Sequence, residues 1–213
     1  MRIIHQDENI LVIDKPAGLP VLPDGWEADA PYLVKILEAD HGKLWVVHRL
    51  DKTTSGVIVF ARDADTHRAL NLQFETHETE KVYHAFLEGN PKWNETIAKH
   101  PLRVNVGHKH RTAVDDKNGK PSETQFKVIK RYQAAALIEA KPMTGRTHQI
   151  RVHAYALGHP LLGDTLYGAE ETNTITRPAL HAHSLTLQLN GEQKTFKASY
   201  PDDFRMALER LKR

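Results

Sequence analysis

The chain of 213 residues contains no cysteine, so disulfides and thiolate metal sites are excluded. It also lacks any apolar run approaching the roughly 20 residues that span a membrane. Acidic residues at Asp7 and Glu8 interrupt the N-terminal segment, which is unlike a signal peptide. No repeat recurs and no linker rich in proline, serine or glycine divides the chain. These absences predict a cytoplasmic protein without a membrane anchor, folded as a single domain over residues 1–213.

The chain also has little net charge, with 29 basic against 27 acidic residues and a balance of +2. Overall charge therefore does not single out a nucleic-acid binder. The segment from Lys99 to Arg131 is different, because nine basic residues stand there against three acidic ones. The nine are Lys99, Arg103, Lys109, Arg111, Lys117, Lys120, Lys127, Lys130 and Arg131. The excess indicates either a solvated charged loop or a surface for nucleic-acid phosphates.

Short segments rich in β-branched and aromatic residues predict strands, and two longer segments predict helices. The expected strands are 10–13, 57–60, 82–88, 123–130, 135–140 and 185–189. The expected helices are amphipathic, over 63–75 with Leu70, Leu72 and Phe74 among its apolar residues, and over 148–157 before Gly158. Strands outnumber helices without regular βαβ alternation, so the sequence predicts an α+β fold.

The most informative segment is His48–Gly56, which reads His-Arg-Leu-Asp-Lys-Thr-Thr-Ser-Gly before the apolar run 57–60. An ordinary polar turn is one interpretation, since Asp, Ser and Gly favour turns. The other interpretation is a reactive carboxylate, because Asp51 stands between the cations Arg49 and Lys52 and beside a strand expected to be buried. A hydrolase using Ser55 is disfavoured, because the serine is not in a Gly-x-Ser-x-Gly elbow.

Two further segments with distinctive sequences follow the Asp51 segment in the chain. They are Glu80-Lys-Val-Tyr-His-Ala85 and Lys141-Pro-Met-Thr-Gly-Arg-Thr-His-Gln-Ile-Arg-Val-His153. With the Asp51 segment they resemble the three motifs of the RluA family of pseudouridine synthases. Weaker similarity covers Ile10–Val21, Gly158–Gly168 and Leu180–His183, so the resemblance extends from about residue 4 to about residue 204.

The resemblance implies a pseudouridine synthase fold with a large, mainly antiparallel mixed sheet. It implies an enzyme that isomerises specific uridines of structured ribosomal or transfer RNA, after flipping the target nucleotide out of its stack. No redox cofactor or metal is expected, since the reaction neither oxidises nor hydrolyses, and histidine pairs such as His148 with His153 lack zinc-site spacing. We also expect a monomer without obligate protein partners and without the N-terminal S4 domain of many relatives. The alternative is an RNA-binding protein that retains the fold without isomerase activity.

The resemblance assigns the chemistry to three residues. Asp51 would act on the sugar or the base, Arg146 would pair with Asp51 and keep it ionised, and Tyr83 would stack on uracil and serve as a late general base. Ile150 would pack against the same ring, although a core position in the helix suits it equally.

Further residues are expected to contact RNA. Arg49 would enter the space of the flipped nucleotide or hold its phosphate, and Lys15 would either reach phosphate or be a solvated turn lysine. Arg103, Lys109 and Arg111 would contact phosphates in the basic segment. His48, by contrast, is expected to be a core histidine that a backbone group satisfies.

Overall fold

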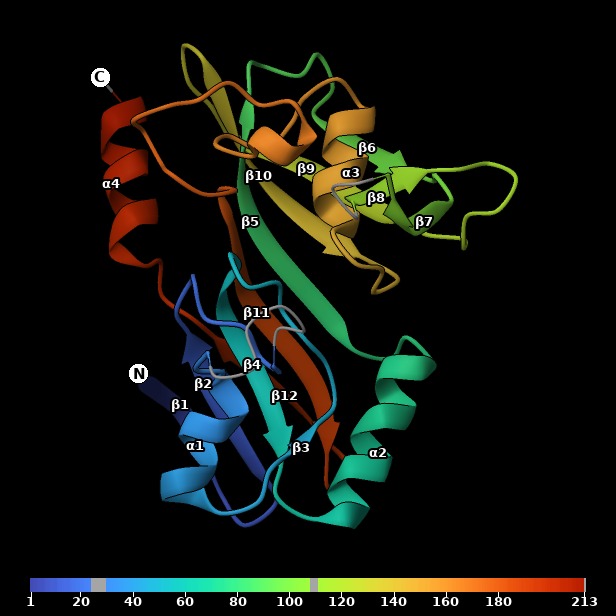
Figure 1. Ribbon diagram of the computed structural model, residues 1–213, viewed down its shortest axis with the longest axis vertical. Helices are drawn as coiled ribbons and strands as arrows, with labels where there is room; N and C mark the ends of the chain where they lie inside the picture. Colours follow the sequence, from blue (N-terminus) through green and yellow to red (C-terminus); the bar gives the residue numbers. More distant parts are fainter. Residues whose placement is uncertain (24–29, 108–110, 213) are drawn as a thin grey trace. The chain divides into compact units, whose positions relative to one another are not determined.

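The computed structural model describes residues 1–23, 30–107 and 111–212 (Figure 1). The chain divides into two compact units, Met1–Lys81 with Ala182–Tyr200, and Val82–His181 with Pro201–Arg213. Strands β5 and β11 each pass from one unit into the other, so the chain crosses between units within regular structure. The single domain predicted over 1–213 stays a prediction.

The first unit is built on the strand order β1-β2-β4-β11, with β12 paired to β11 and β3 paired to β4. Its elements are β1 (Arg2–Gln6), β2 (Ile10–Lys15), α1 (Leu33–His41), β3 (Trp45–Val46), β4 (Ser55–Ala61), α2 (Ala64–Glu75), β11 (Leu180–Leu189) and β12 (Glu192–Lys197). The pairs β1–β2, β2–β4, β3–β4 and β11–β12 are antiparallel.

Strands β2 and β4 form the buried centre of this unit. The side chains of Ile10 to Ile13 and of Ile58 to Ala61 are all 0% exposed, and Ile13 pairs with Ile58. Because both faces of these strands are covered, their sequences are continuous apolar runs rather than alternating patterns. Strand β4 is the element that follows Asp51.

The residues that helix α2 buries differ in part from the apolar residues expected to form its buried face. Its N-terminus is capped by Asp63, whose carboxylate accepts hydrogen bonds from the amides of Asp65 and Thr66. Leu72 is 59% exposed, whereas Gln73 is buried. Gln73 replaces an apolar residue there because its amide exchanges two 2.8 Å hydrogen bonds with the backbone of Gln188.

The second unit has the strand order β5-β10-β9-β6 and a separate hairpin of β7 and β8. Its elements are β5 (Glu80–Glu88), β6 (Glu95–Ala98), β7 (Leu102–Val106), β8 (Arg111–Val114), β9 (Thr124–Arg131), β10 (Ala135–Pro142), α3 (Gln149–Ala156), the 3₁₀ turn η1 (Thr165–Tyr167) and α4 (Asp202–Leu211). Helix α3 lies against β9 and β10 (Figure 1).

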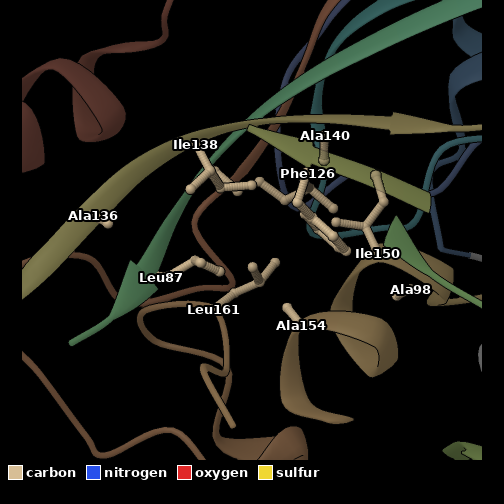
Figure 2. Close-up of a cluster of buried hydrophobic side chains, with 11 residues drawn as sticks. Leu87, Ala98, Phe126, Ala136, Ile138, Ala140, Ile150, Ala154 and Leu161 are labelled. Atoms are coloured by element: carbon tan, nitrogen blue, oxygen red, sulfur yellow. The ribbon is translucent and has the colours of Figure 1, made fainter. Parts of the chain in front are cut away.

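A cluster of buried side chains joins α3 to this sheet. Figure 2 shows Ile150 and Ala154 of α3 facing Phe126 of β9, Ala140 of β10 and Leu161. Every residue from Gln149 to Ala154 is buried, so α3 is an enclosed helix and not the amphipathic one predicted. Its polar residues Gln149, Arg151 and His153 therefore need internal partners.

The fold class predicted from the sequence, α+β with a large, mainly antiparallel mixed sheet, is confirmed. All six predicted strands and both predicted helices are present within a few residues of their expected bounds. The elements not predicted from the sequence are α1, α4, β1, β3, β6, β7, β8 and β12. Within the described ranges, no helix combines the length and apolar character needed to cross a membrane.

Candidate active site

The segment before Asp51 is fixed to β4 by His48. The β3–β4 ladder ends at the pair Val46–Phe60, and the amide of the next residue, Val59, donates to Nε2 of His48 at 3.1 Å. The imidazole also stacks on Phe74 of α2, with ring centroids 4.6 Å apart. Burial lowers the pKa of His48 to about 3, and the nearby charge of Lys81 acts in the same direction. The ring is therefore neutral at pH 7. The prediction that a backbone group satisfies this histidine is confirmed, although His48 is only partly buried.

Lys15 does not have the role expected of it. Its side chain is 0% exposed, and its ammonium donates to the carbonyl oxygens of Pro16, Leu19 and Lys52 at 2.9, 2.7 and 3.3 Å. Both earlier interpretations of Lys15, a phosphate contact and a solvated turn lysine, are wrong, because the ammonium is enclosed by backbone oxygens. Its charge instead ties the turn after β2 to the peptide that follows Asp51.

The loop carrying Asp51 has further backbone support. The amide of Gly18 also donates to the carbonyl of Lys52, at 2.8 Å, and the amide of Thr54 donates to the carbonyl of Asp51 at 3.0 Å. Asp51 is half-buried and Arg49 is exposed. The carboxylate thus stands on a braced turn at the start of a buried strand, which limits its conformational freedom.

Tyr83 and Ile150 are brought together in the second unit. On β5, Tyr83 pairs in register with Ala140 of β10. Both face the side of the sheet that α3 covers, where Ile150 is 5% exposed and the tyrosine ring packs against its cluster. Tyr83 is only part-buried, so the ring has both an anchored and an accessible surface.

The turn that carries Arg146 is held by the amide side chain of Gln149. Its Oε1 accepts from the hydroxyl of Thr144 at 2.6 Å and from the amide of Arg146 at 3.0 Å. Its Nε2 donates at 2.9 Å to the carbonyl of Glu123 and to the hydroxyl of Thr124. All four hydrogen-bonding positions of the amide are used, so the turn is tied to the start of β9. The Arg146 guanidinium itself donates from Nε to the carbonyl of Pro121 at 3.4 Å.

The hydrogen bonds continue from Thr124 to His153. Nδ1 of His153 lies 2.9 Å from the Thr124 hydroxyl, and Nε2 lies 3.1 Å from the carbonyl of His100. A carbonyl can only accept, so Nε2 carries the proton and Nδ1 accepts from Thr124. Burial lowers the pKa of His153, which favours this neutral form. Across the described part of the chain, no three His, Asp or Glu residues are grouped so as to hold a metal ion.

The basic segment is partly neutralised within the second unit. Arg103 pairs with Asp115 at 2.8 Å, Lys99 with Glu123 at 3.1 Å, and Lys127 with Glu95 at 3.0 Å. Five basic residues of the segment are exposed and form no ion pair with any residue that the structure describes: Arg111, Lys117, Lys120, Lys130 and Arg131. Arg111 lies on β8, and Lys117 and Lys120 lie in the turn that follows it. Lys109 lies outside the described residues.

Comparison with known proteins identifies the family to which these residues belong. The family model described as RNA pseudouridylate synthase matches residues 9–156, which include Asp51, Tyr83 and Arg146. The chain belongs to the RNA pseudouridine synthase family. It is 39% identical, over 95% of its length and 93% of the relative's, to the dual-specificity RNA pseudouridine synthase RluA of Escherichia coli K12. It is 34% identical to the ribosomal large subunit pseudouridine synthase D of Zymomonas mobilis, over 99% of this chain and 73% of the relative.

Solved structures agree with the assignment. Human RNA pseudouridylate synthase domain containing 4 superposes with a TM-score of 0.81 at 29% identity, covering 98% of this chain and 92% of the human one. The corresponding human domain containing 1 protein gives 0.78 at 28% identity, covering 93% and 83%. This pseudouridine synthase is therefore an RluA-type enzyme that isomerises uridine in RNA, and the RNA-binding protein without activity is not supported.

The structure distributes the predicted site residues of the synthase over its two units. Arg49 and Asp51 belong to the first, together with Lys15, whereas Tyr83, Arg146, Ile150, Arg103 and Arg111 belong to the second. The pairing of Asp51 with Arg146 joins residues of different units, so it stays a prediction.

Sequence reasoning gave no role to Gln149, His153 or Tyr167 of the synthase, although all three lie in segments that carry the resemblance. Gln149 could have been noticed, because a glutamine in the first turn of a helix can reach the turn before it. The partners of His153 and Tyr167 are tens of residues away in the chain, and no local signal identifies them.

Proposed function

We propose that this synthase isomerises a uridine in a folded loop of ribosomal or transfer RNA, with Asp51 as its catalytic carboxylate. The reaction breaks the bond from N1 of uracil to C1′ of ribose and joins C1′ to C5. C5 loses a proton and N1 gains one, so atoms and electrons balance without a cofactor. The observation that carries the proposal is the braced Asp51 turn, where His48, Lys15 and Thr54 fix the backbone around one half-buried carboxylate. A nucleophile or base held in this way loses little freedom when the substrate binds.

Arg146 is the cation proposed to pair with Asp51. A guanidinium beside a carboxylate stabilises its ionised form in a site from which water is excluded. The four hydrogen bonds of Gln149 support this role, because they fix the backbone of the Arg146 turn before substrate arrives. Preorganised charge of this kind stabilises a transition state without a cost of reorganisation.

Tyr83 is proposed to stack on the target uracil and to accept the C5 proton late in the reaction. The support is its position, half-buried on the face of β5 that also carries the cluster with Ile150. An aromatic ring with an apolar residue beside it can grip a flat base. Arg49, which is exposed, is proposed to fill the space of the flipped nucleotide or to hold its phosphate.

RNA phosphates are proposed to bind at the β7–β8 hairpin and the turn that follows it. Arg111, Lys117 and Lys120 suit this role better than Arg103, whose guanidinium is already paired with Asp115. Lys109 is proposed as a further contact. Exposed cations outside ion pairs displace counterions when they meet phosphate, and this gives binding its dependence on salt.

The proposed phosphate contacts can be tested by salt titration. Replacing Arg111 and Lys120 by alanine should flatten the plot of log K against log salt by about 0.7 to 0.9 for each phosphate that is no longer neutralised. The matched control is Lys127→Ala. The ammonium of Lys127 is already paired with Glu95, so its removal should leave the slope unchanged. An unchanged slope in the double variant would place the RNA on another surface.

The enzyme is proposed to work as a monomer in the cytoplasm. One relative is named for the ribosomal large subunit, and ribosomal RNA is made and assembled in that compartment of a bacterial cell. The absence of cysteine suits a reducing environment. Sedimentation of the purified protein with and without RNA tests the oligomeric state.

The decisive experiment is a pseudouridine map by carbodiimide labelling and primer-extension stops. Total ribosomal and transfer RNA from a strain lacking the gene is compared with RNA from strains rescued by the wild type or by Asp51→Asn. A stop that disappears on deletion and returns only with the wild type identifies the RNA and the catalytic role of Asp51. Return of the stop with Asp51→Asn would remove this carboxylate from the mechanism.

A further inference from the structure

Tyr167 links two parts of the second unit that the mechanism treats separately. Its hydroxyl accepts a hydrogen bond from the amide of Thr112 at 3.0 Å and lies 2.9 Å from Nδ1 of His148. Thr112 belongs to β8 of the basic hairpin, and His148 ends the turn that carries Arg146. One buried hydroxyl thus joins the proposed phosphate surface to the proposed catalytic arginine.

The tyrosine ring is held firmly enough to transmit a displacement. It is 2% exposed and packs with Leu102 of β7 and Val152 of α3. The Arg151 guanidinium lies over the ring at 5.0 Å and is itself fixed to Asp164 by two hydrogen bonds of 2.6 and 2.8 Å. Burial raises the pKa of Tyr167, so the hydroxyl keeps its proton over the working range of pH. A tyrosine enclosed on every side moves with the elements that enclose it.

His148 is the point at which such a displacement would act. Its backbone is left-handed, with φ of 54°, and it stands between Arg146 and the first residue of α3. A residue other than glycine is strained at positive φ, so the surrounding contacts must hold it there. The hydrogen bond from its ring to Tyr167 is such a contact. The turn is held on its other side by Gln149, as described above.

We propose that Tyr167 is a positioning residue that couples RNA docking on the β7–β8 hairpin to the placement of the Arg146 turn. The binding of RNA and the role of Arg146 in this inference rest on the proposed function. The link between Thr112, Tyr167 and His148 rests on the hydrogen bonds alone. When phosphates bind beside Arg111, the neighbouring amide of Thr112 is held against the Tyr167 hydroxyl, and the imidazole of His148 with it. Docking of the correct RNA then stabilises the turn in which Arg146 is ready to act. RNA that fails to engage the hairpin leaves the turn less ordered.

The link itself is tested without any assay of activity, by amide hydrogen exchange of the full chain. Tyr167→Phe keeps the ring and removes the hydroxyl. We expect the Thr112 amide to exchange about tenfold faster, because its acceptor is gone, and the Arg146 amide to exchange faster as well. The matched control is Tyr155→Phe, since Tyr155 lies 6.5 Å from Tyr167 between ring centroids but is half-exposed. Faster exchange at Thr112 with an unchanged rate at Arg146 would overturn the coupling.

The second test is single-turnover conversion of an RNA that the wild type modifies. Tyr167→Phe should reduce the rate of conversion by about tenfold or more while the Kd for RNA changes less than about threefold. Arg111→Ala should do the reverse and mainly weaken binding. A purely structural role predicts equal losses of folded protein and rate, and the rate is therefore expressed per folded molecule from the unfolding curve. An unchanged rate in Tyr167→Phe would contradict the proposal.

A second variant protects the test if Tyr167→Phe folds poorly. His148→Gly accommodates the left-handed backbone and removes the ring that Tyr167 contacts, so it should show the same loss of rate. Full activity of His148→Gly would overturn the proposal. If the wild type converts no uridine in any RNA, the proposed function fails, whereas the exchange experiment still decides whether the link exists.

Discussion

Acidification should lower the free energy of unfolding, and His48 is a group responsible, because the fold holds its ring neutral. Nε2 of His48 accepts the hydrogen bond from Val59, so the contact exists only while the imidazole is neutral. Protonation would turn both ring nitrogens into donors and leave the Val59 amide without its acceptor. Because His48 lies three residues before Asp51, loss of its hydrogen bond with Val59 would release the backbone next to the proposed catalytic turn.

The size of the effect follows from the two pKa values. The pKa of His48 is about 3 in the folded protein, against 6.5 for the unperturbed side chain. A folded-state pKa below the unfolded one means that the unfolded chain takes up the proton first, so stability falls as pH drops below about 6.5. At pH 5 the folded ring is still neutral, and each pH unit below 6.5 costs about 1.4 kcal/mol. The free energy of unfolding should therefore fall by about 2 kcal/mol between pH 7 and pH 5 on account of His48.

The measurement is urea unfolding of the wild type and of His48→Gln at pH 7 and at pH 5. Glutamine can offer an oxygen to the Val59 amide and does not titrate, so it reports the contribution of all other groups. Histidines such as His153 are present in both proteins and cancel in the difference. We expect the wild type to lose about 2 kcal/mol more than the variant. Equal losses in the two proteins would refute the argument that the fold holds His48 neutral.

Three further outcomes are expected. Gly56→Ala should destabilise the fold by about 3 kcal/mol or more in urea unfolding, because φ is +116° and the new Cβ would lie 2.2 Å from the carbonyl oxygen of Ala182. Asp164→Ala should cost about 3 to 5 kcal/mol by leaving the buried Arg151 without its carboxylate, whereas Glu209→Ala, which breaks an exposed pair, should cost less than about 1 kcal/mol. Tyr83→Phe should bind RNA normally and lose late proton transfer in a single-turnover assay, and a wild-type rate would leave its hydroxyl without a catalytic part.

The central elements of each unit could be predicted from the sequence, because the signals there are local. The apolar runs of β2 and β4 have no charged interruption, and this is what a strand covered on both faces requires. Asp63 and Gly158 mark a helix start and a helix end through their own side-chain and backbone preferences. Strand β7 was missed although Leu-Arg-Val-Asn-Val alternates apolar and polar residues, because the surrounding basic segment was interpreted as a charged loop or a phosphate surface. Strand β8 has only four residues, Arg-Thr-Ala-Val, and no strict alternation.

The residues of the candidate site could be found from their types and order in the sequence. The hydrogen bonds that fix their positions could not, because they join residues far apart in the chain. The sequence alone indicates that Lys15 is a surface lysine. Its three carbonyl partners are apparent only in the structure, and one of them belongs to a loop 37 residues away. Tyr167 reads as a core aromatic until Thr112, 55 residues away, is seen to donate to it. Partners so distant in sequence leave no periodicity or spacing to detect.

The family, the catalytic candidates Asp51, Tyr83 and Arg146, and the α+β class could all be predicted without a structure. These follow from residue types and local order, which survive without knowledge of contacts. Three features became apparent only in the folded chain: Lys15 is a buried brace, Gln73 and not Leu72 faces the core, and the side chains around Arg146 are held by Gln149, His153 and Tyr167. A buried polar group is stable only where it has hydrogen-bond partners, and it is the fold, not the neighbouring sequence, that brings those partners to it.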